Sequence, residues 1–249
     1  MFEADRAALI DVYRRLAGQP DDARRVGWPA RWVQWLAFEM LVGIADLRGA
    51  DVLDVGCGLG DLYAFLAARG GVGAYRGVDL APDLVAAAQA RHPGASFAVV
   101  DILVSDLEPA DYVLASALFD ARTPNSPAVL RAVLRRLFAL ARCGLAWNIF
   151  LEPTAPDQYS EPLGTLTAFC AGLTPYLTVR TDYNLNHATF YLYRHGAFHT
   201  PQSRALAGRL YLEPALRRRL AQEPAAVAAE YGLSLRALSF LLGAADVEA

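Results

Sequence analysis

Short apolar, β-branched runs alternate with amphipathic stretches through the middle of the chain. The runs predict strands and the stretches predict helices, because apolar positions recur with the period of each structure. The predicted strands are 51–56, 74–80, 96–102, 110–119 and 144–150, and the predicted helices between them are 61–69, 82–91 and 126–142. A helix that links two strands forms a crossover, which keeps those strands parallel. The pattern therefore predicts an α/β fold with a doubly wound, mostly parallel sheet.

Two further β-rich runs, 176–184 and 188–195, come later in the chain. A few polar residues join them, and so short a link suits an antiparallel hairpin. We therefore expect the sheet to end in an antiparallel hairpin strand.

Helical patterns flank this sheet region on both sides. They predict an N-terminal helical cap over 1–48, within a sheet domain of 1–197. Residues 198–249 are predicted to form a small helical appendage, and its helices are too short to bury a core of their own. We therefore expect the appendage to pack on the sheet domain or on a second copy of the chain in a homodimer.

Composition narrows the class of protein. The 249 residues are 55% hydrophobic and 20% charged, with a net charge of −3, which disfavours a nucleic acid as the partner. No stretch reaches the ~18 apolar residues of a membrane span, and no apolar leader opens the chain, so we expect a cytoplasmic protein. Cys57, Cys143 and Cys170 form no C-x-x-C pair, which argues against a disulfide framework and against a bound metal.

A glycine-rich turn follows the first predicted strand in the segment VLDVGCGLGDL. Gly56, Gly58 and Gly60 would let a ligand lie against the main chain, beside the free amides that begin the next helix. A dinucleotide fingerprint would need a glycine at 61, where Asp61 stands and would repel a pyrophosphate. With Asp54 at the strand end, the turn instead suits a ligand that carries positive charge.

Acidic residues also end the second and third predicted strands. Asp79 could accept both hydroxyls of a ribose, or it could cap the helix that follows it. Asp101 could accept a hydrogen bond from an adenine amino group, with Ile102 against the ring, or it could be a solvated turn residue. The carboxyl ends of parallel strands meet at one edge, which is where open α/β sheets bind ligands.

The run 52–62, the segment Gly77-Val78-Asp79 and Asp101 together resemble class I S-adenosylmethionine-dependent methyltransferases, which have a Rossmann-like fold. The resemblance covers about 25–195 and includes a bacterial subgroup. It implies S-adenosylmethionine as cofactor, with the three glycines near its methionine part, Asp79 at the ribose and Asp101 at the adenine. Five other residues are expected to contact the cofactor: Asp54, Cys57, Leu80, Ile102 and Ser116. Separately, the appendage resembles the small α subunit of LigAB-type dioxygenases, without any metal ligands of such enzymes.

The methyl acceptor is expected beside the ends of the fourth and fifth strands and the late hairpin. The candidate catalytic residues there are His187, Asp120, Tyr183 and Asn148. Histidine is the usual general base because its ordinary pKa lies near neutrality. The alternatives are an exposed turn histidine at 187 and a capping role for Asp120.

Two functions remain open from the sequence. The first is an enzyme that methylates a small molecule or a peptide. The second is a noncatalytic module that uses the cofactor fold to assemble with a partner protein. The intact glycine turn and Asp79 favour the enzyme.

Overall fold

The computed structural model describes residues 3–153, 155–183, 186–194, 201–233 and 238. They fall into two compact units, which divide after Arg194. The predicted domain boundary at 197 lies outside the described residues. The two units are described separately below.

The first unit contains a mixed sheet of seven strands in the order β3-β2-β1-β4-β5-β7-β6. The strands are β1 (Asp51–Val55), β2 (Ala74–Asp79), β3 (Ser96–Val99), β4 (Ala110–Ala115), β5 (Ala141–Phe150), β6 (Leu177–Arg180) and β7 (His187–Tyr193). Neighbouring strands are parallel except at β7, which is antiparallel to both β5 and β6. The predicted doubly wound sheet with a final antiparallel hairpin is therefore confirmed.

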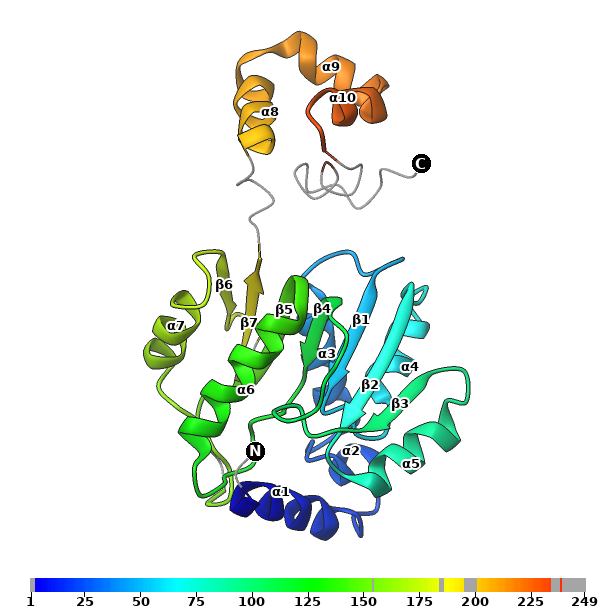
Figure 1. Cartoon of the computed structure of the whole chain (residues 1–249), viewed down its shortest axis with the longest axis vertical. Coiled ribbons are helices and arrows are strands. Elements are labelled where there is room, and N and C mark those ends of the chain that lie inside the picture. Colours follow the sequence, from blue (N-terminus) through cyan, green and yellow to red (C-terminus); the bar gives the residue numbers. More distant parts are fainter. Residues whose placement is uncertain (1–2, 154, 184–185, 195–200, 234–237, 239–249) are drawn as a thin grey trace. The chain divides into compact units, whose positions relative to one another are not determined.

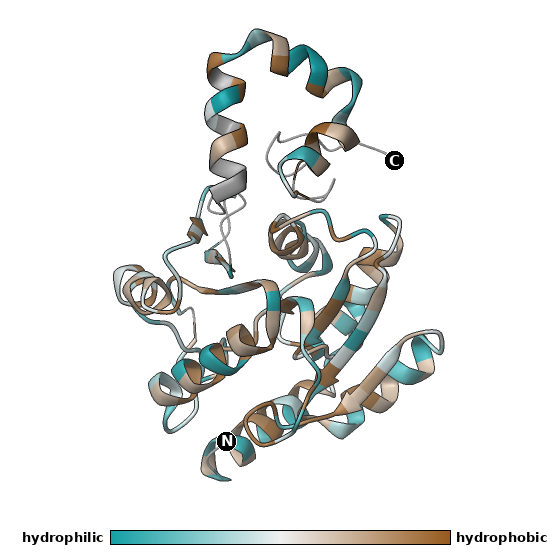
Figure 2. Cartoon of the chain, turned by 45° about the horizontal axis from the view of Figure 1, so that its top comes forward, coloured by the Kyte–Doolittle hydropathy of each residue, from teal (hydrophilic) through white to brown (hydrophobic). Residues whose placement is uncertain are grey.

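Helices cover both faces of this sheet (Figure 1). They are α1 (Glu3–Leu16), α2 (Asp22–Arg25), α3 (Arg31–Val42), α4 (Asp61–Ala67), α5 (Pro82–Arg91), α6 (Ser126–Leu140) and α7 (Leu163–Ala171). Side chains of α6 and α7 share one buried apolar cluster with the sheet, and side chains of α3, α4 and α5 share another. The helices of this unit carry both hydrophobic and hydrophilic positions (Figure 2), as helices that cover a sheet require.

Helix α6 illustrates how the sequence produces this layer. Apolar residues recur on one face of the helix, and Pro127 occupies the first turn, where a missing amide costs nothing. The buried face consists of Val129, Leu130, Val133, Leu134, Leu137, Phe138 and Leu140. Because this face packs on β4 and β5, it fixes the position of the strand ends that carry the candidate acceptor residues.

Several predicted boundaries differ from the structure. The fourth strand ends at Ala115 rather than at 119, because Ala117 takes a left-handed φ of 54° and leaves the strand conformation. The fifth strand starts at Ala141, directly after α6, and not at 144. Helices α2 and α7 were not predicted. The first spans four residues, and the second contains three glycine or β-branched positions that weaken a helical pattern.

The second unit contains α8 (Pro201–Leu212), α9 (Pro214–Gln222) and α10 (Pro224–Glu230). A proline stands in the first turn of α9 and of α10. The helices bury an apolar cluster of Leu206, Leu216, Leu220, Val227, Ala228 and Leu238. The expectation that these helices bury no core of their own is therefore wrong for the described residues. The parts of the predicted appendage at 198–200, 234–237 and 239–249 lie outside them.

Within the described part of the chain, no helix has both the length and the apolar character needed to cross a membrane.

Candidate active site

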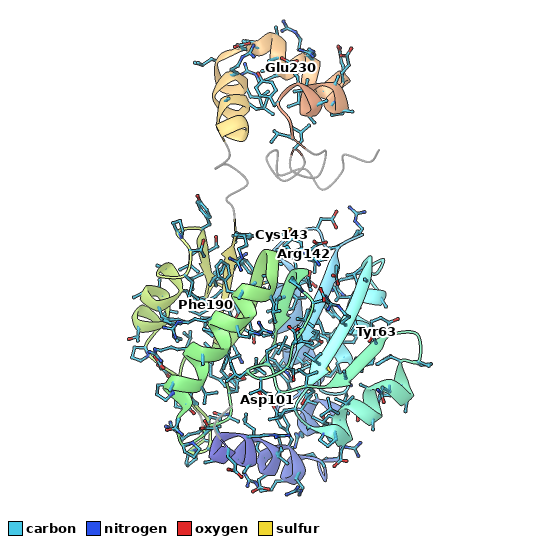
Figure 3. The ribbon with its side chains drawn as sticks, viewed as in Figure 1. Tyr63, Asp101, Arg142, Cys143, Phe190 and Glu230 are labelled. Atoms are coloured by element: carbon cyan, nitrogen blue, oxygen red, sulfur yellow. The ribbon has the colours of Figure 1, made fainter. Side chains whose placement is uncertain are left out.

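The candidate site lies at the edge of the sheet where the parallel strands end. In Figure 3, Asp101 lies at this edge, whereas Arg142 and Cys143, at the start of β5, lie at the opposite edge. Helices α1 and α2 lie across the same edge as Asp101 (Figure 1). Strands β1 and β4 are neighbours here although they are far apart in sequence, so the chain reverses its winding direction between them. Such a switch point is where open α/β sheets bind ligands.

The glycine turn between β1 and α4 has a backbone that other residues rarely adopt. Gly56, Gly58 and Gly60 have φ values of 79°, 53° and 79°, all in the left-handed region. A Cβ on Gly56 would lie 2.8 Å from a methyl of Leu118, and a Cβ on Gly58 would lie 2.9 Å from a methyl of Val26. The turn therefore needs glycine both for its conformation and for the space above its main chain.

Asp79 fastens this turn to the end of β2. Its side chain accepts hydrogen bonds from the amides of Gly58 and Ala81, each at 2.9 Å. Burial raises the pKa of the Asp79 carboxyl, and the amide hydrogen bonds lower it in part. A carboxylate oxygen has more than one acceptor position, so Asp79 can hold the turn and still accept from a ligand hydroxyl.

Asp54 is a buried carboxyl at the end of β1, with 2% exposure. The pKa of Asp54 is raised to about 7. Burial is the largest cause, the charges of Asp79 and Asp61 add to it, and the hydrogen bond from Tyr75 opposes it. The Tyr75 hydroxyl donates that bond to Oδ2 at 2.5 Å. A nearby cation favours the ionised form of a carboxyl. A positively charged ligand would therefore lower the pKa of Asp54 and favour its ionised form near neutral pH.

Asp61, which begins α4, is held by the N-terminal helices. Arg31 pairs with Asp61 at 2.6 Å, and the amide of Gln34 donates to its other oxygen at 3.1 Å. The charge of Asp61 is thus largely balanced by α3, so the acidity of the turn comes mainly from Asp54 and Asp79.

A small enclosed cavity of about 30 Å³ lies above the turn. Six predicted cofactor residues line it: Asp54, Gly56, Cys57, Gly58, Asp79 and Ser116. Its remaining walls include Tyr13, Val26, Trp28 and Gln34 from the N-terminal cap. Sequence patterns gave no sign of Tyr13, Val26 and Gln34, because nothing local shows that these parts of the cap cover the turn. This volume is smaller than the roughly 300 Å³ or more of a typical small-molecule pocket.

The other predicted cofactor residues lie around this cavity without lining it. Gly60 begins α4 and packs against His92 and Phe97. Asp101 accepts a hydrogen bond from the Leu103 amide at 3.0 Å, and Ile102 belongs to the apolar cluster that contains α6. Leu80 directly follows Asp79 and is half-buried.

Two further cavities adjoin the cofactor turn on the side of β5 and β7. The larger, of about 560 Å³, is lined by Leu16, Gln19, Arg24, Gly27, Trp28, Pro29, Val33, Phe150, Gln158, Asn186 and His187. The smaller, of about 130 Å³, is lined by Val12, Tyr13, Leu16, Val26, Gly27, Ala117, Asp120, Ala121, Phe150, Asp157 and Gln158. The smaller shares Tyr13, Val26 and Ala117 with the cavity above the turn. The cavity above the turn therefore shares one wall with the smaller cavity, and the two further cavities form the candidate acceptor region.

His187 and Asp120 meet in this acceptor region. Nε2 of His187 lies 3.9 Å from Oδ2 of Asp120. The ring of His187 stacks on Trp28, with centroids 5.3 Å apart, and contacts Phe150 at 4.2 Å. With 2% of the residue exposed, His187 is buried, so the alternative of an exposed turn histidine is wrong. Asp120 does not cap the next segment, since its Oδ1 accepts from the Phe150 amide at 3.3 Å.

Asn148 and Tyr183 lie behind these cavities rather than in their walls. The Oδ1 of Asn148 accepts from the Ala117 amide at 2.8 Å, and its Nδ2 lies 3.4 Å from the Ser116 hydroxyl. The Tyr183 hydroxyl lies 2.8 Å from that of Thr189, and burial raises the pKa of Tyr183 to about 12. Asn148 thus fixes the strained loop at Ala117, which lines both the cavity above the turn and the smaller cavity.

Comparisons with known proteins agree with this geometry. Residues 52–139 match a family model described as a methyltransferase domain. A Mycobacterium tuberculosis protein named as a methyltransferase is 35% identical over 114 residues, which are 44% of this chain and 69% of that protein. Trans-aconitate 2-methyltransferase of Methylobacterium nodulans is 30% identical over 141 residues, which are 56% of this chain. That match spans about half the relative, 51% of its length.

Solved structures show the same fold. Magnesium protoporphyrin IX methyltransferase from Synechocystis PCC 6803 superposes with a TM-score of 0.56, at 16% identity, over 76% of this chain and 99% of that one, in a structure that contains SAH. A second structure of that enzyme, with SAM, gives the same TM-score at 17% identity.

The fold and the glycine turn define a Rossmann-like methyltransferase. The chain belongs to the methyltransferase family, and it is an enzyme that uses S-adenosylmethionine. This finding decides against the noncatalytic assembly module that the sequence left open.

Proposed function

We propose that this enzyme methylates a small molecule or a peptide bound in the two cavities beside β5 and β7. The observation that carries the proposal is the shared wall of Tyr13, Val26 and Ala117, which adjoins the glycine turn on one side and Asp120 on the other. An acceptor in this space would lie next to a cofactor on the turn. Alignment of the two reactants is the main contribution that an enzyme makes to methyl transfer.

The cofactor contacts are proposed from the same edge of the sheet. The main chain at Gly56, Gly58 and Gly60 would lie against the methionine part, with Asp54 as the carboxylate that faces its positive charge. Asp79, whose carboxylate is at the end of β2, would accept from the ribose hydroxyls. When bound, S-adenosylmethionine supplies a methyl group on a positively charged sulfur. The left-handed glycines and the two buried carboxyls fit such a cationic, phosphate-free ligand.

The adenine end is proposed to reach Asp101. Asp101 follows β3 at the same edge, with Ile102 and Leu80 nearby in sequence at the neighbouring strand ends. Cys57 and Ser116 line the cavity above the turn and would contact the bound cofactor through their own atoms. These assignments follow the resemblance of the motifs and the order of the strands.

The acceptor side divides its candidate residues into two kinds. Asp120 lines the acceptor cavity and can touch an acceptor, so we assign it the catalytic role. Asn148 and Tyr183 act through their neighbours as positioning residues, since their polar atoms bond Ala117 and Thr189.

A carboxylate acceptor, which the name of the trans-aconitate relative suggests, finds little support in these cavities. Among the described residues that line them, Arg24 is the one cationic side chain other than a protonated histidine, and it pairs with Asp21 at 3.1 Å. Asp120 and Asp157 line the smaller cavity and would repel a carboxylate.

Calorimetry with S-adenosylmethionine and S-adenosylhomocysteine tests the cofactor site directly. We expect Gly58→Ala to lose measurable binding, because its Cβ would lie within 2.9 Å of Val26 and above the turn. Gly71→Ala is the matched control, since Gly71 also has a left-handed φ, of 77°, but nothing lies within 4 Å of its Cβ. Equal cofactor affinity in the two variants would contradict the proposed site.

A second measurement tests catalysis on unknown acceptors. The full chain is incubated with methyl-labelled S-adenosylmethionine and a mixture of small metabolites and peptides, and labelled products are separated by mass. The Gly58→Ala variant should give no labelled product, whereas the Gly71→Ala variant should give the products of the natural chain.

A further inference from the structure

Apolar and aromatic side chains form much of the walls of the two candidate acceptor cavities, and polar or charged side chains form the rest. The rings of Trp28 and Phe150 each pack against the ring of His187. Leu16 lines both cavities and Val33 closes the larger one. Phe150 is common to both, so the two cavities adjoin across one aromatic side chain. Walls of this kind favour a flat, apolar ligand skeleton, which gains most from contact with rings.

The polar end of this space is acidic. Asp120 has 14% of its side chain exposed and uses Oδ1 to accept from the Phe150 amide. Oδ2 faces His187 at 3.9 Å, a distance too long for a hydrogen bond. Asp120 therefore keeps acceptor capacity for a group in the cavity. A ligand that brings an N–H or O–H would be matched there.

His187 supports Asp120 from behind. Its two ring nitrogens are buried, and among the residues that the structure describes neither has a hydrogen-bond partner. His187 lines the larger cavity with its ring, but both nitrogens are buried, and Nε2 lies 3.9 Å from Oδ2 of Asp120. Burial raises the pKa of Asp120 and the neighbouring His187 lowers it. His187 thus helps Asp120 to stay ionised while the apolar surroundings make that carboxylate a stronger base than an exposed one.

We infer, on the basis of the proposed function, that the acceptor is a flat, mostly apolar small molecule that presents an uncharged phenol hydroxyl or aryl amine to Asp120. Asp120 is the catalytic base and His187 is its positioning residue. A phenol and an aryl amine share a nucleophilic atom that carries a proton. A carboxylate carries no proton at neutral pH.

The reaction balances with the groups present. A lone pair on the acceptor oxygen or nitrogen forms the new bond to the methyl carbon. The carbon–sulfur bond breaks with its electron pair on sulfur, which becomes neutral. The proton of the acceptor passes to the Asp120 carboxylate and is later released to water. General base catalysis of this kind contributes about 10²- to 10⁴-fold to a rate.

A matched set of naphthalenes tests the inference: 2-naphthol, 2-naphthylamine, 2-naphthoate and naphthalene itself. They share one flat skeleton and differ in the group presented to Asp120. Binding is measured by calorimetry on the full chain saturated with S-adenosylhomocysteine, and methyl transfer by formation of S-adenosylhomocysteine from S-adenosylmethionine. We expect 2-naphthol or 2-naphthylamine to bind at least about tenfold more tightly than 2-naphthoate and to be methylated, the two probes being separate arms that identify the nucleophile.

Variants at Asp120 and His187 test their roles. Asp120→Asn keeps an oxygen for the Phe150 amide, so the fold should persist, but methylation of the preferred probe should fall about 10²-fold or more. The same change should remove the discrimination against 2-naphthoate. Asp106→Asn, at an exposed position, is the matched control and should change neither quantity.

His187→Gln is tested by the pH dependence of the rate, which a purely structural role of His187 would not change. Without the histidine, the pKa of Asp120 should rise, so the fall in rate at acidic pH should begin at a higher pH. Other ionisable groups around Asp120 are Tyr13 from α1, Asp157 from the segment after β5 and Tyr183 from the segment before β7, and all three are kept in this variant. An unchanged pH profile would show that His187 does not position Asp120.

The failures of the two proposals are distinguishable. Loss of S-adenosylmethionine binding by the natural chain would contradict the proposed function itself. If the cofactor binds, then preference for 2-naphthoate, binding of no naphthalene, or full activity of folded Asp120→Asn would overturn the acceptor class inferred here.

Discussion

Replacement of Asp79 separates a cofactor contact from a structural one. The sequence alone predicts that Asp79→Ala weakens S-adenosylmethionine binding by about 1–3 kcal/mol and leaves the fold intact. The structure changes the second half of that prediction, because Asp79 is 7% exposed and accepts from the amides of Gly58 and Ala81. In Asp79→Ala both buried amides lose their acceptor.

The magnitude follows from those two hydrogen bonds. An unsatisfied buried donor costs about 1–3 kcal/mol, so Asp79→Ala should lower the free energy of unfolding by about 2–6 kcal/mol. Burial of the charged carboxyl opposes part of this loss, since burial raises the pKa of Asp79 and the natural residue is itself costly to ionise. A protein domain has roughly 5–15 kcal/mol of stability, so the alanine variant will be visibly less stable.

Asp79→Asn isolates the cofactor contact. The asparagine oxygen can still accept a hydrogen bond from one of the two backbone amides. The loss of stability in Asp79→Asn should therefore be about half that in Asp79→Ala. Its Nδ2 cannot accept from a ribose hydroxyl, so cofactor affinity should still fall by about 1–3 kcal/mol, or roughly 5- to 150-fold.

Urea unfolding and calorimetry with S-adenosylhomocysteine measure the two quantities separately. Asp106→Asn serves as the control, because it makes the same chemical change at an exposed position. A folded Asp79→Asn variant with the natural affinity would refute the ribose assignment. An Asp79→Ala variant as stable as the natural chain would refute the structural role.

Three further predictions concern pH, the loop at β4 and the appendage. Because the pKa of Asp54 is raised to about 7, its contribution to the free energy of unfolding is greatest below pH ~4 and declines, by up to ~4 kcal/mol, as pH rises to 7. Over pH 6–8, the affinity for S-adenosylmethionine should rise as Asp54 ionises, and Tyr75→Phe should move that rise to higher pH. In Asp54→Asn, calorimetry should show no such rise in affinity. Asn148→Ala should cost about 1–3 kcal/mol of stability in urea, since the Ala117 amide loses its acceptor, and a natural unfolding midpoint would contradict this role. The expected homodimer predicts that light scattering finds a chain ending at Arg194 to be a monomer and the full chain to be a dimer, and the same oligomeric state for both would disprove it.

The resemblance of the C-terminal helices to a dioxygenase subunit stays a prediction. The described helices α8–α10 bury an apolar cluster, which any small helical unit requires. A dioxygenase activity would need metal-ligating side chains, and the resemblance brings none.

Local patterns were sufficient for the sheet and the glycine turn. Strand β1 is apolar and buried, and the segment after it has glycines at the three positions where the structure has left-handed backbone. Asp79 could be placed at the same edge as Asp54, since both end neighbouring parallel strands. These inferences succeed because the period of apolar residues and the conformational freedom of glycine act within a few residues of chain.

The acceptor region could not be read in the same way. His187 stands in a polar sequence typical of an exposed turn, yet Trp28 and Phe150 bury it. Asn148 was expected near the acceptor, but its amide bonds the strained loop at Ala117 instead. Nothing near these residues in sequence indicates their partners.

The sequence by itself thus determined the succession of strands and helices along the chain, the glycine turn and the acidic strand ends. Tertiary structure alone decided that Tyr13 and Val26 line the cavity above that turn, and that Asp120 lines the smaller neighbouring cavity while His187 lines the larger one. The physical reason is the range of the forces involved. Backbone conformation and apolar periodicity are local properties, whereas burial, ion pairing and cavity walls depend on residues that meet only when distant segments pack together.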